Sequence, residues 1–176
     1  MSDTPTFASS ITTASGPTEG PVMLADLSHL AKLVVKTTPA RPAGLGPVFG
    51  SSEVVGEALV CGSRPGEWLV LGSEQSVEEV VAGLAAHIVD LTHGRALIQI
   101  AGESSAATLE KLCSLDWTDR MMPDGAVASA SVAKVSCDVI RHDHEGRPAY
   151  LVAADRSFGQ YLYEAFADAA AEFATT

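Results

Sequence analysis

The segment DLSHLAKLVVK, Asp26 to Lys36, has a near copy in DLTHGRALIQI, Asp90 to Ile100, and the two align without a gap. Both begin with Asp-Leu-Ser/Thr-His and continue into an apolar stretch. Asp and Ser or Thr side chains commonly accept hydrogen bonds from backbone N–H groups where a strand begins, which is one explanation of the repeat. Internal duplication of a supersecondary unit is the other. Either explanation predicts a strand after each tetrapeptide.

The composition limits the classes of protein to which this sequence can belong. The chain has 176 residues and a formal net charge of −11, with only 11 Lys and Arg. Nucleic acid is therefore not an expected partner, because the phosphate backbone requires basic surface. No apolar run approaches the roughly 20 residues of a membrane span, and the N-terminus does not read as a signal peptide. We expect a cytoplasmic protein with no membrane contact.

Two segments have the composition of irregular structure. Residues 1–20 are rich in Ser, Thr, Pro and Gly and show almost no apolar periodicity, so burial cannot offset the entropy of ordering them. We expect a flexible N-terminal arm at 1–20, or one that orders on a partner, and a single domain over 21–176. Residues 37–52 contain three prolines and three glycines. Loops of this length are often functional or held by another chain.

The rest of the chain alternates between strand and helix signals. Apolar runs at 57–63 and 67–73 flank Arg64-Pro65-Gly66, a spacing typical of a β-hairpin. Ser76 and Glu79 have capping-box spacing and predict the start of a helix. Further strands are predicted before and after Gly94 and at 127–140 and 149–154, and further helices at 105–113 and from Ser157 onward. This order predicts an α+β fold, a mixed sheet with helices packed on one face.

The residues that most often hold metals do not occur in metal-binding patterns. Cys61, Cys113 and Cys137 are far apart, with no Cys-x-x-Cys pair, so buried thiols are expected. His142 and His144 alternate just before a Gly turn, and a solvent-exposed turn is the favoured interpretation. We expect no metal site. The sequence GLGPVFG lacks the strand-to-helix context of a dinucleotide loop.

Two stretches of the sequence resemble known families. DLSHLAKLVV resembles the opening of the folate-binding domain of the glycine cleavage system T protein, an aminomethyltransferase. The region from about Arg64 to Phe173 is more similar to the gamma subunit of heterotetrameric sarcosine oxidase, a compact relative of that domain. Five segments carry this second resemblance in the family's order and spacing: RPGEWLVLG (64–72), VDLTHGRALIQIAG (89–102), LCSLDW (112–117), PDGAVASASVAKV (123–135) and DRSFGQYLYEAF (155–166).

The resemblance implies an aminomethyltransferase (folate-binding domain)-like fold and a set of partner subunits. These are an alpha subunit with folate and dinucleotide sites, a beta subunit with flavins, and a small zinc-binding delta subunit. FAD, FMN, NAD, tetrahydrofolate and zinc are thus expected on partner subunits and no cofactor on this chain. The implied complex demethylates sarcosine, or a related N-methyl amine, to glycine, hydrogen peroxide and formaldehyde or 5,10-methylenetetrahydrofolate.

The implied role of this chain is that of a non-catalytic gamma-type subunit. The T protein's catalytic element is a pair of adjacent aspartates on a strand, and the matching KVSCDVI has Asp138 alone, with Cys137 in place of the other acid. A lone carboxylate cannot orient folate and stabilise charge as a pair does. The alternatives are a free-standing folate-dependent aminomethyl transferase and a plain interaction module of the same fold.

The sequence offers only weak candidates for a cofactor-binding site: His93, Arg95 and Asp138. His93 and Arg95 flank Gly94 and could together meet an anion or a flavin phosphate at a subunit junction. Alternatively, Arg95 forms a surface ion pair with Asp90, which is the interpretation we favour. No catalytic residue is predicted.

Aromatic side chains supply the candidate interface anchors. Only 19% of the residues are charged and 6% are aromatic, which predicts an interface that is more apolar than charged. Trp68 on the predicted hairpin and Tyr161 and Tyr163 on the last helix are the candidates. Because Tyr161 and Tyr163 are two apart on a helix, at most one of them is expected in the core.

Overall fold

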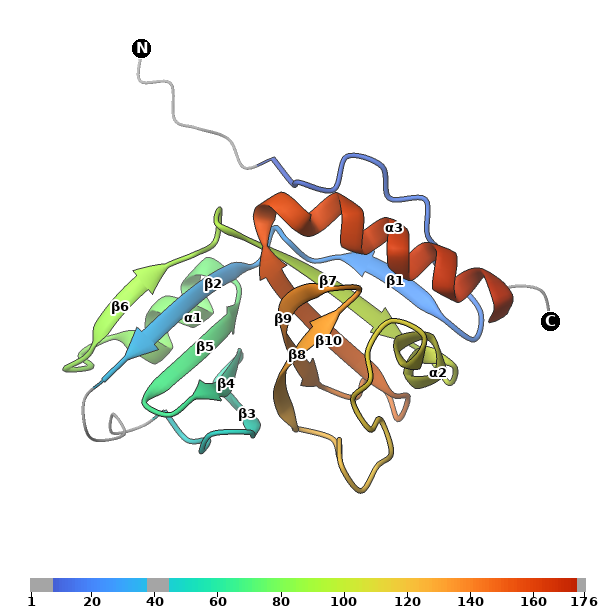
Figure 1. Ribbon diagram of the computed structural model, residues 1–176. Helices are drawn as coiled ribbons and strands as arrows, with labels where there is room; N and C mark the ends of the chain where they lie inside the picture. Colours follow the sequence, from blue (N-terminus) through green and yellow to red (C-terminus); the bar gives the residue numbers. More distant parts are fainter. Residues whose placement is uncertain (1–7, 38–44, 174–176) are drawn as a thin grey trace, which may run out of the picture.

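The computed structural model describes residues 8–37 and 45–173, and its strands form two five-stranded sheets (Figure 1). The first sheet has the spatial order β1 (Met23–Asp26), β7 (Arg95–Ala101), β10 (Ala149–Asp155), β9 (Val135–Arg141), β8 (Val127–Val132). The second has the order β3 (Ser52–Val55), β4 (Ala58–Arg64), β5 (Glu67–Gly72), β2 (Ala31–Lys36), β6 (His87–Asp90). The α+β class is confirmed.

The prediction of one mixed sheet is wrong. All strand pairs of the two sheets are antiparallel in the part of the chain that the structure describes. Sequence order alone does not give strand direction, and short connections between consecutive strands favour antiparallel pairs. The division into two sheets arises where the chain bends at the repeated tetrapeptides.

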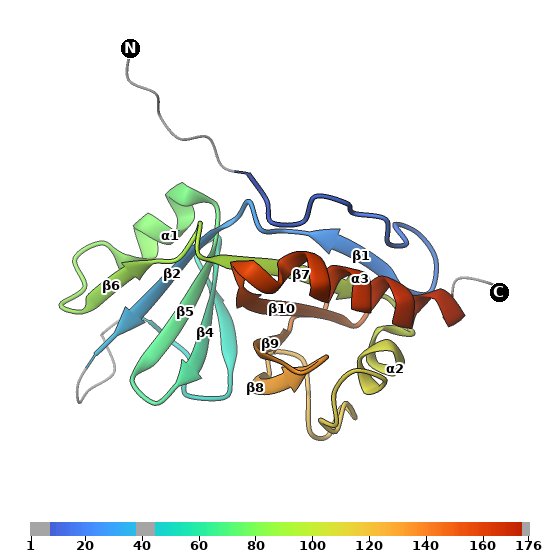
Figure 2. The same ribbon diagram turned by 45° about the horizontal axis from the view of Figure 1, so that its top comes forward.

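The two repeats are the crossovers between the sheets. The chain leaves the first sheet after β1 and enters the second at β2, then returns from β6 to β7. β1 pairs with β7, with Asp26 opposite Ile98, and β2 pairs with β6, with Leu33 opposite Asp90. The repeats therefore run side by side in opposite directions through the junction (Figures 1 and 2).

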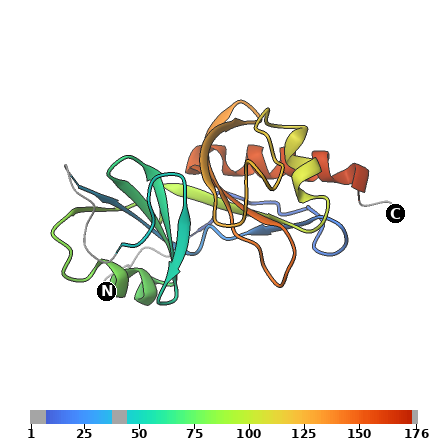
Figure 3. The same cartoon turned by 90° about the horizontal axis from the view of Figure 1, so that it is seen from below.

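The helices cover the outer faces of the two sheets, and not one face of a single sheet as predicted. One core lies under α2 and α3, one lies under α1, and a third lies between the sheets. Helix α1 (Glu74–Val81) packs on β2 and β5, and α3 (Gly159–Ala170) packs on β7 and on the short α2 (Ser105–Glu110). Short 3-10 turns at Arg156–Phe158 and Ala171–Phe173 flank α3. The central core, which includes Val34 and Leu97, joins side chains of both sheets. Seen from below, α1 lies with the second sheet, and α2 and α3 lie with the first (Figure 3). Across the described ranges, no helix is both long and apolar enough to span a bilayer.

Several predicted elements are confirmed and three details are corrected. The hairpin around Arg64-Pro65-Gly66 and the strands on either side of Gly94 are present. The first helix is capped by Ser73, whose side chain accepts from the amide of Ser76, so Ser76 is not the cap. The predicted strand at 127–140 is a hairpin, β8 and β9, because Ala133 and Lys134 adopt positive φ and form its turn. Strands β1 and β3 were not predicted.

The described part of the N-terminal arm lies against α3. Residues 8–20 contain no helix or strand, but the amides of Thr12 and Thr13 donate to the Gln160 side chain (2.7 and 3.1 Å) and Ile11 is buried. Residues 1–7, and residues 38–44 of the predicted loop at 37–52, lie outside the described residues. Flexibility of the arm stays a prediction.

Candidate functional site

The aspartate of each repeat holds the local turn. An oxygen of the Asp26 carboxylate accepts from the backbone N–H of Ser28 (2.9 Å), and Asp90 accepts in the same way from Thr92 (2.8 Å). Hydrogen bonds from the backbone and the side chain of Thr92 lower the pKa of the Asp90 carboxyl, since they favour its charged form. The local interpretation of the repeated tetrapeptide, in which its side chains satisfy backbone donors, is confirmed.

The hydroxyl of each repeat holds the other repeat. Ser28 Oγ accepts from the amide of Leu97 on β7 (3.0 Å), and Thr92 Oγ1 accepts from the amide of Lys32 on β2 (3.0 Å). The residue before each hydroxyl makes a matching main-chain hydrogen bond. The amide of Leu27 donates to the carbonyl of Leu97, and the amide of Leu91 donates to the carbonyl of Lys32, each at 2.8 Å. Each crossover thus provides hydrogen bonds to backbone groups of the strand that follows the other crossover. The two sets of hydrogen bonds are related by an approximate twofold axis, as expected for a duplicated unit.

Lys32 adds a buried charge to this junction. Its side chain is completely buried, and its Nζ donates to the carbonyls of Ser28 (2.8 Å) and Leu30 (2.6 Å). Burial lowers the pKa of Lys32 to about 8, although the nearby carboxylates of Asp26 and Asp90 act in the opposite direction. The ammonium group therefore binds the carbonyls of the bend between β1 and β2.

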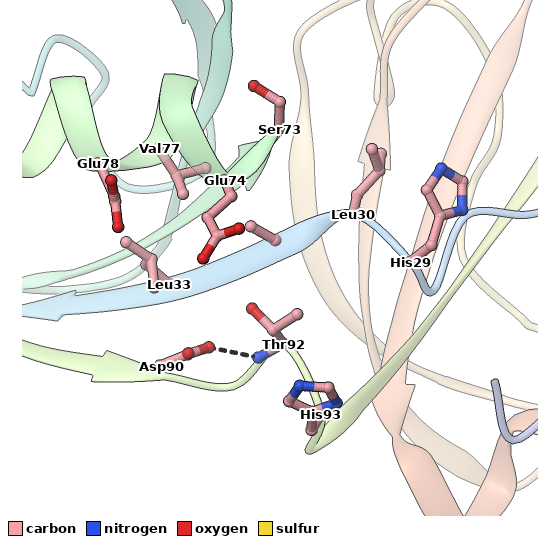
Figure 4. Close-up of a pocket in the computed structure, with 12 residues that line it drawn as sticks. His29, Leu30, Leu33, Ser73, Glu74, Val77, Glu78, Asp90, Thr92 and His93 are labelled. Carbon is pink, nitrogen blue, oxygen red and sulfur yellow. Dashed lines mark hydrogen bonds between the residues drawn. The ribbon is translucent and has the colours of Figure 1, made fainter. Parts of the chain in front are cut away.

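A surface groove of about 420 Å³ lies beside the crossovers, and we call it the crossover groove. It is lined by His29, Leu30, Ala31, Leu33, Gly72, Ser73, Glu74, Val77, Glu78, Asp90, Thr92 and His93. Figure 4 shows Glu74 and Glu78 extending from α1 on one side of β2, with Asp90, Thr92 and His93 on the other side. The floor is apolar and the rim carries three carboxylates, while none of its lining residues is Lys or Arg.

A second charged cluster connects the two sheets. The Asp138 carboxylate on β9, which is 1% exposed, accepts from Arg95 Nη1 of β7 (2.8 Å), from Ser129 Oγ (2.9 Å) and at longer range from Arg64 Nη2 of β4 (3.4 Å). Arg95 also donates to the carbonyl of Ala153 (3.0 Å). The expected surface pair between Arg95 and Asp90 is wrong, because Arg95 turns toward the sheet junction and pairs with the buried Asp138.

Comparison with known proteins identifies the family of this chain. The family model described as "Sarcosine oxidase, gamma subunit family" matches residues 46–172, which is most of the chain. The chain belongs to the sarcosine oxidase gamma subunit family.

Two relatives and a solved structure are similar to this chain over nearly its whole length. The sarcosine oxidase subunit gamma of Corynebacterium sp. (strain P-1) is 24% identical over 182 residues, and that of Arthrobacter sp. is 25% identical over 178. Each alignment covers 92% of this chain and 86% of the relative. A chain in the structure of heterotetrameric sarcosine oxidase from Corynebacterium sp. U-96 in complex with pyrrole 2-carboxylate superposes with a TM-score of 0.75 at 19% identity, covering 93% of this chain and 91% of that chain. The fold of that chain is therefore shared over nearly the whole sequence.

The structure separates the weak candidates for cofactor binding. His93 lines the crossover groove, whereas Arg95 lines a cleft between the sheets together with Lys36 and Arg64. Arg95 and Asp138 are brought together as an ion pair. His93 and Arg95 thus lie in different cavities, although they are two residues apart.

The three candidate interface anchors differ in exposure. Trp68 is 5% exposed and donates from its indole nitrogen to the carbonyl of Pro47 (2.9 Å), and Tyr163 is 2% exposed. Tyr161 is 50% exposed, with its hydroxyl donating to the carbonyl of Ala133 (3.0 Å). The prediction that at most one of the two tyrosines is in the core is confirmed, and Tyr161 is the candidate that a partner could reach without unfolding the chain.

The structure also shows where the cysteines and the potential metal ligands lie. The three cysteines are buried free thiols, as predicted, and burial raises the pKa of Cys137 to about 11. Within residues 8–37 and 45–173, no group of three or more His, Cys, Asp and Glu side chains is placed to hold a metal.

Sequence reasoning missed Lys32, Arg64 and the acidic groove. A signal for Lys32 was present, because alternation along the strand places it on the same face as the buried Val34. Arg64 was missed because its position in the Arg64-Pro65-Gly66 turn predicts an exposed side chain and gives no indication of a buried partner.

Proposed function

We propose that this chain is the gamma subunit of a heterotetrameric sarcosine oxidase and acts as a non-catalytic structural subunit. The observation that carries the proposal is the match of residues 46–172 to the gamma subunit family, supported by the fold similarity over 93% of the chain. The substrate of the complex is sarcosine or a related N-methyl amine. Its partners are alpha, beta and delta subunits, which bear FAD, FMN, NAD, tetrahydrofolate and zinc. We also propose that the fold is related to the aminomethyltransferase folate-binding domain and that the complex is cytoplasmic.

The environment of Asp138 supports a non-catalytic role. Asp138 lies in the segment KVSCDVI, which resembles the catalytic strand of the T protein, and its carboxylate is already bound by Arg95, Arg64 and Ser129. A carboxylate that is buried and surrounded by these donors is not placed to orient a folate nitrogen. Its charge is used to connect β9 to β7 and β4 instead.

Co-expression tests the proposal. The tagged chain, produced together with the flavoprotein subunits proposed as its partners, is expected to purify as a complex with a flavin absorbance spectrum and sarcosine-dependent peroxide release. The chain produced alone is expected to show neither. Tight folate binding by the isolated chain, or peroxide release from sarcosine without the other subunits, would support the free-standing transferase or an oxidase activity of this chain and would refute the proposal.

A further inference from the structure

We propose that the crossover groove is the docking site for a basic segment of a partner subunit, with a Lys or Arg side chain inserted between α1 and the crossover. This inference rests on the proposed function, because it requires a partner subunit. It adds the chemistry of the contact, which membership of the family does not give.

The charge of the groove is one-sided. Glu74, Glu78 and Asp90 lie on its rim, and its lining contains no Lys or Arg. Among the described residues, none of these three carboxylates forms a salt bridge with a Lys or Arg side chain, although the buried Lys32 and the imidazole of His93 act electrostatically on Asp90. The whole chain carries a net charge of −11. A positively charged segment is therefore the electrostatically complementary occupant.

The shape of the groove fits a side chain with an aliphatic stem. Its floor is formed by Leu30, Ala31, Leu33 and Val77, and its volume is about 420 Å³. Lys and Arg cover apolar surface with their methylene groups while the charged head remains at the polar rim. The acids surround this floor from α1 on one side and from the end of β6 on the other (Figure 4). The apolar floor of the groove thus matches the aliphatic stem of a Lys or Arg side chain, and the acidic rim matches its charged head.

Local structure explains two of the carboxylates but not the third. Glu74 lies in the first turn of α1, where a negative charge stabilises the helix dipole. Asp90 accepts from the amide of Thr92. Glu78 lies in the middle of α1, and among the described residues its carboxylate has neither a hydrogen bond from a side chain nor an ion pair. Glu78 is consequently the residue at which docking can be tested with little effect on the fold.

The adjacent residue provides a matched control. Glu79 is exposed on the same helix and accepts from the Gln75 side chain (2.8 Å), but it does not line the groove. Charge reversal at Glu78 and at Glu79 changes the net charge of the chain by the same amount. A difference between Glu78→Lys and Glu79→Lys therefore reports the groove and not the overall charge.

The test measures assembly of the full-length chain with its co-expressed partner subunits by biolayer interferometry at several salt concentrations. We expect Glu78→Lys to weaken association by at least about 100-fold, since like charges in contact cost several kcal/mol, and Glu78→Gln to weaken it by about tenfold. Glu79→Lys is expected to bind like the wild type. Added salt should weaken the wild type more than Glu78→Lys.

Carbodiimide cross-linking of the wild-type complex identifies the occupant, because this reagent joins carboxylates to Lys amines. We expect a peptide of this chain containing Glu74 or Glu78 to be linked to a partner subunit. Normal assembly of Glu78→Lys, or a link between two copies of this chain, would overturn the docking inference and leave the proposed function standing. If the wild-type chain itself does not assemble, the proposed function fails, and the inference fails with it.

Discussion

Replacement of Asp138 by Asn should strongly destabilise the chain, because the change removes the counter-ion of a largely buried guanidinium group. The side chain of Arg95 is 13% exposed and that of Asp138 is 2% exposed, and their charged atoms are 2.8 Å apart. Asn keeps the shape and can still accept from Ser129, so lost packing contributes little. The expected effect is therefore almost entirely electrostatic.

The magnitude follows from the burial of the pair. Removing one partner of a buried ion pair costs about 3–5 kcal/mol, because the other charge stays buried without compensation. For a chain of this size, each kcal/mol lowers the melting temperature by about 2–4 °C. Asp138→Asn should thus lower it by about 6–20 °C. A loss of this size is a large part of the roughly 5–15 kcal/mol that stabilises a typical domain.

Arg64 provides the matched control, since it is the second cation on the same carboxylate. Its side chain is 50% exposed, its contact with Asp138 is 3.4 Å, and it has a second partner in Glu67. Solvent-exposed pairs contribute only about 0–1 kcal/mol. Arg64→Ala should therefore lower the melting temperature by no more than about 4 °C.

Urea and thermal denaturation of the full-length variants, followed by circular dichroism, are the measurements. The double variant Arg95→Met/Asp138→Leu should be more stable than either single variant, because no unpaired charge remains. Equal small losses for Asp138→Asn and Arg64→Ala would refute the argument that burial decides the contribution. In the assembled complex at low temperature, Asp138→Asn should keep its turnover, and a tenfold loss, equivalent to about 1.4 kcal/mol, would return Asp138 to the catalytic candidates.

Three further predictions concern other parts of the chain. Because the pKa of Lys32 falls from 10.5 to about 8 on folding, the unfolded state binds more protons at this group between these values, so the contribution of Lys32 to the free energy of unfolding should rise with pH across this window by up to about 3 kcal/mol. The buried thiols of Cys61 and Cys137, whose pKa burial raises, act in the opposite direction in both proteins, so urea titrations of wild type and Lys32→Met at pH 7.5, 9 and 10.5 are compared. The difference between them should change with pH in favour of the wild type, and a difference that does not change with pH would contradict the prediction. An absorbance scan of the purified chain alone should show no flavin, and light scattering should show association unless partner subunits are added. Tyr161→Ala should weaken subunit binding by about 2 kcal/mol without lowering the melting temperature, whereas Tyr163→Ala, at a buried position, should reduce stability by about 3–5 kcal/mol; the reverse pattern would exclude Tyr161 as an anchor.

The sequence predicted those elements whose signals are local. The hairpin at Arg64-Pro65-Gly66 was evident because Pro and Gly mark its turn, and the last helix because its apolar residues recur on one face. The turn at Ala133 and Lys134 was missed, because neither residue favours the positive φ that it adopts there. The short strand β1 was missed because its four residues give too few positions for a period to be recognised.

The long-range features could not be predicted from such signals. The sequence showed that the Asp-Leu-Ser/Thr-His repeat lies before strands, but not that the two copies bind each other across a junction between sheets. The ion-pair partner of Arg95 could not be predicted for the same reason, since it also lies on a distant segment of the chain. Asp90 is five residues away in the sequence, and Asp138 becomes its partner only because β7 and β9 both flank β10. Contacts between distant segments follow from topology, which local periodicity does not specify.

The position of the crossover groove couples assembly to the stability of the sheet junction. Its lining comes from the first repeat (His29, Leu30, Ala31 and Leu33), from the second repeat (Asp90, Thr92 and His93), and from α1 with the two residues before it. The same two repeats hold each other through the hydroxyls of Ser28 and Thr92. A partner that binds this surface contacts both crossovers at once, and it binds only while they remain paired. Binding to the folded state alone stabilises that state by mass action. Occupation of the groove should therefore raise the melting temperature of the chain. Conversely, Ser28→Ala, which removes a hydrogen bond between the crossovers, should weaken assembly even though Ser28 does not line the groove.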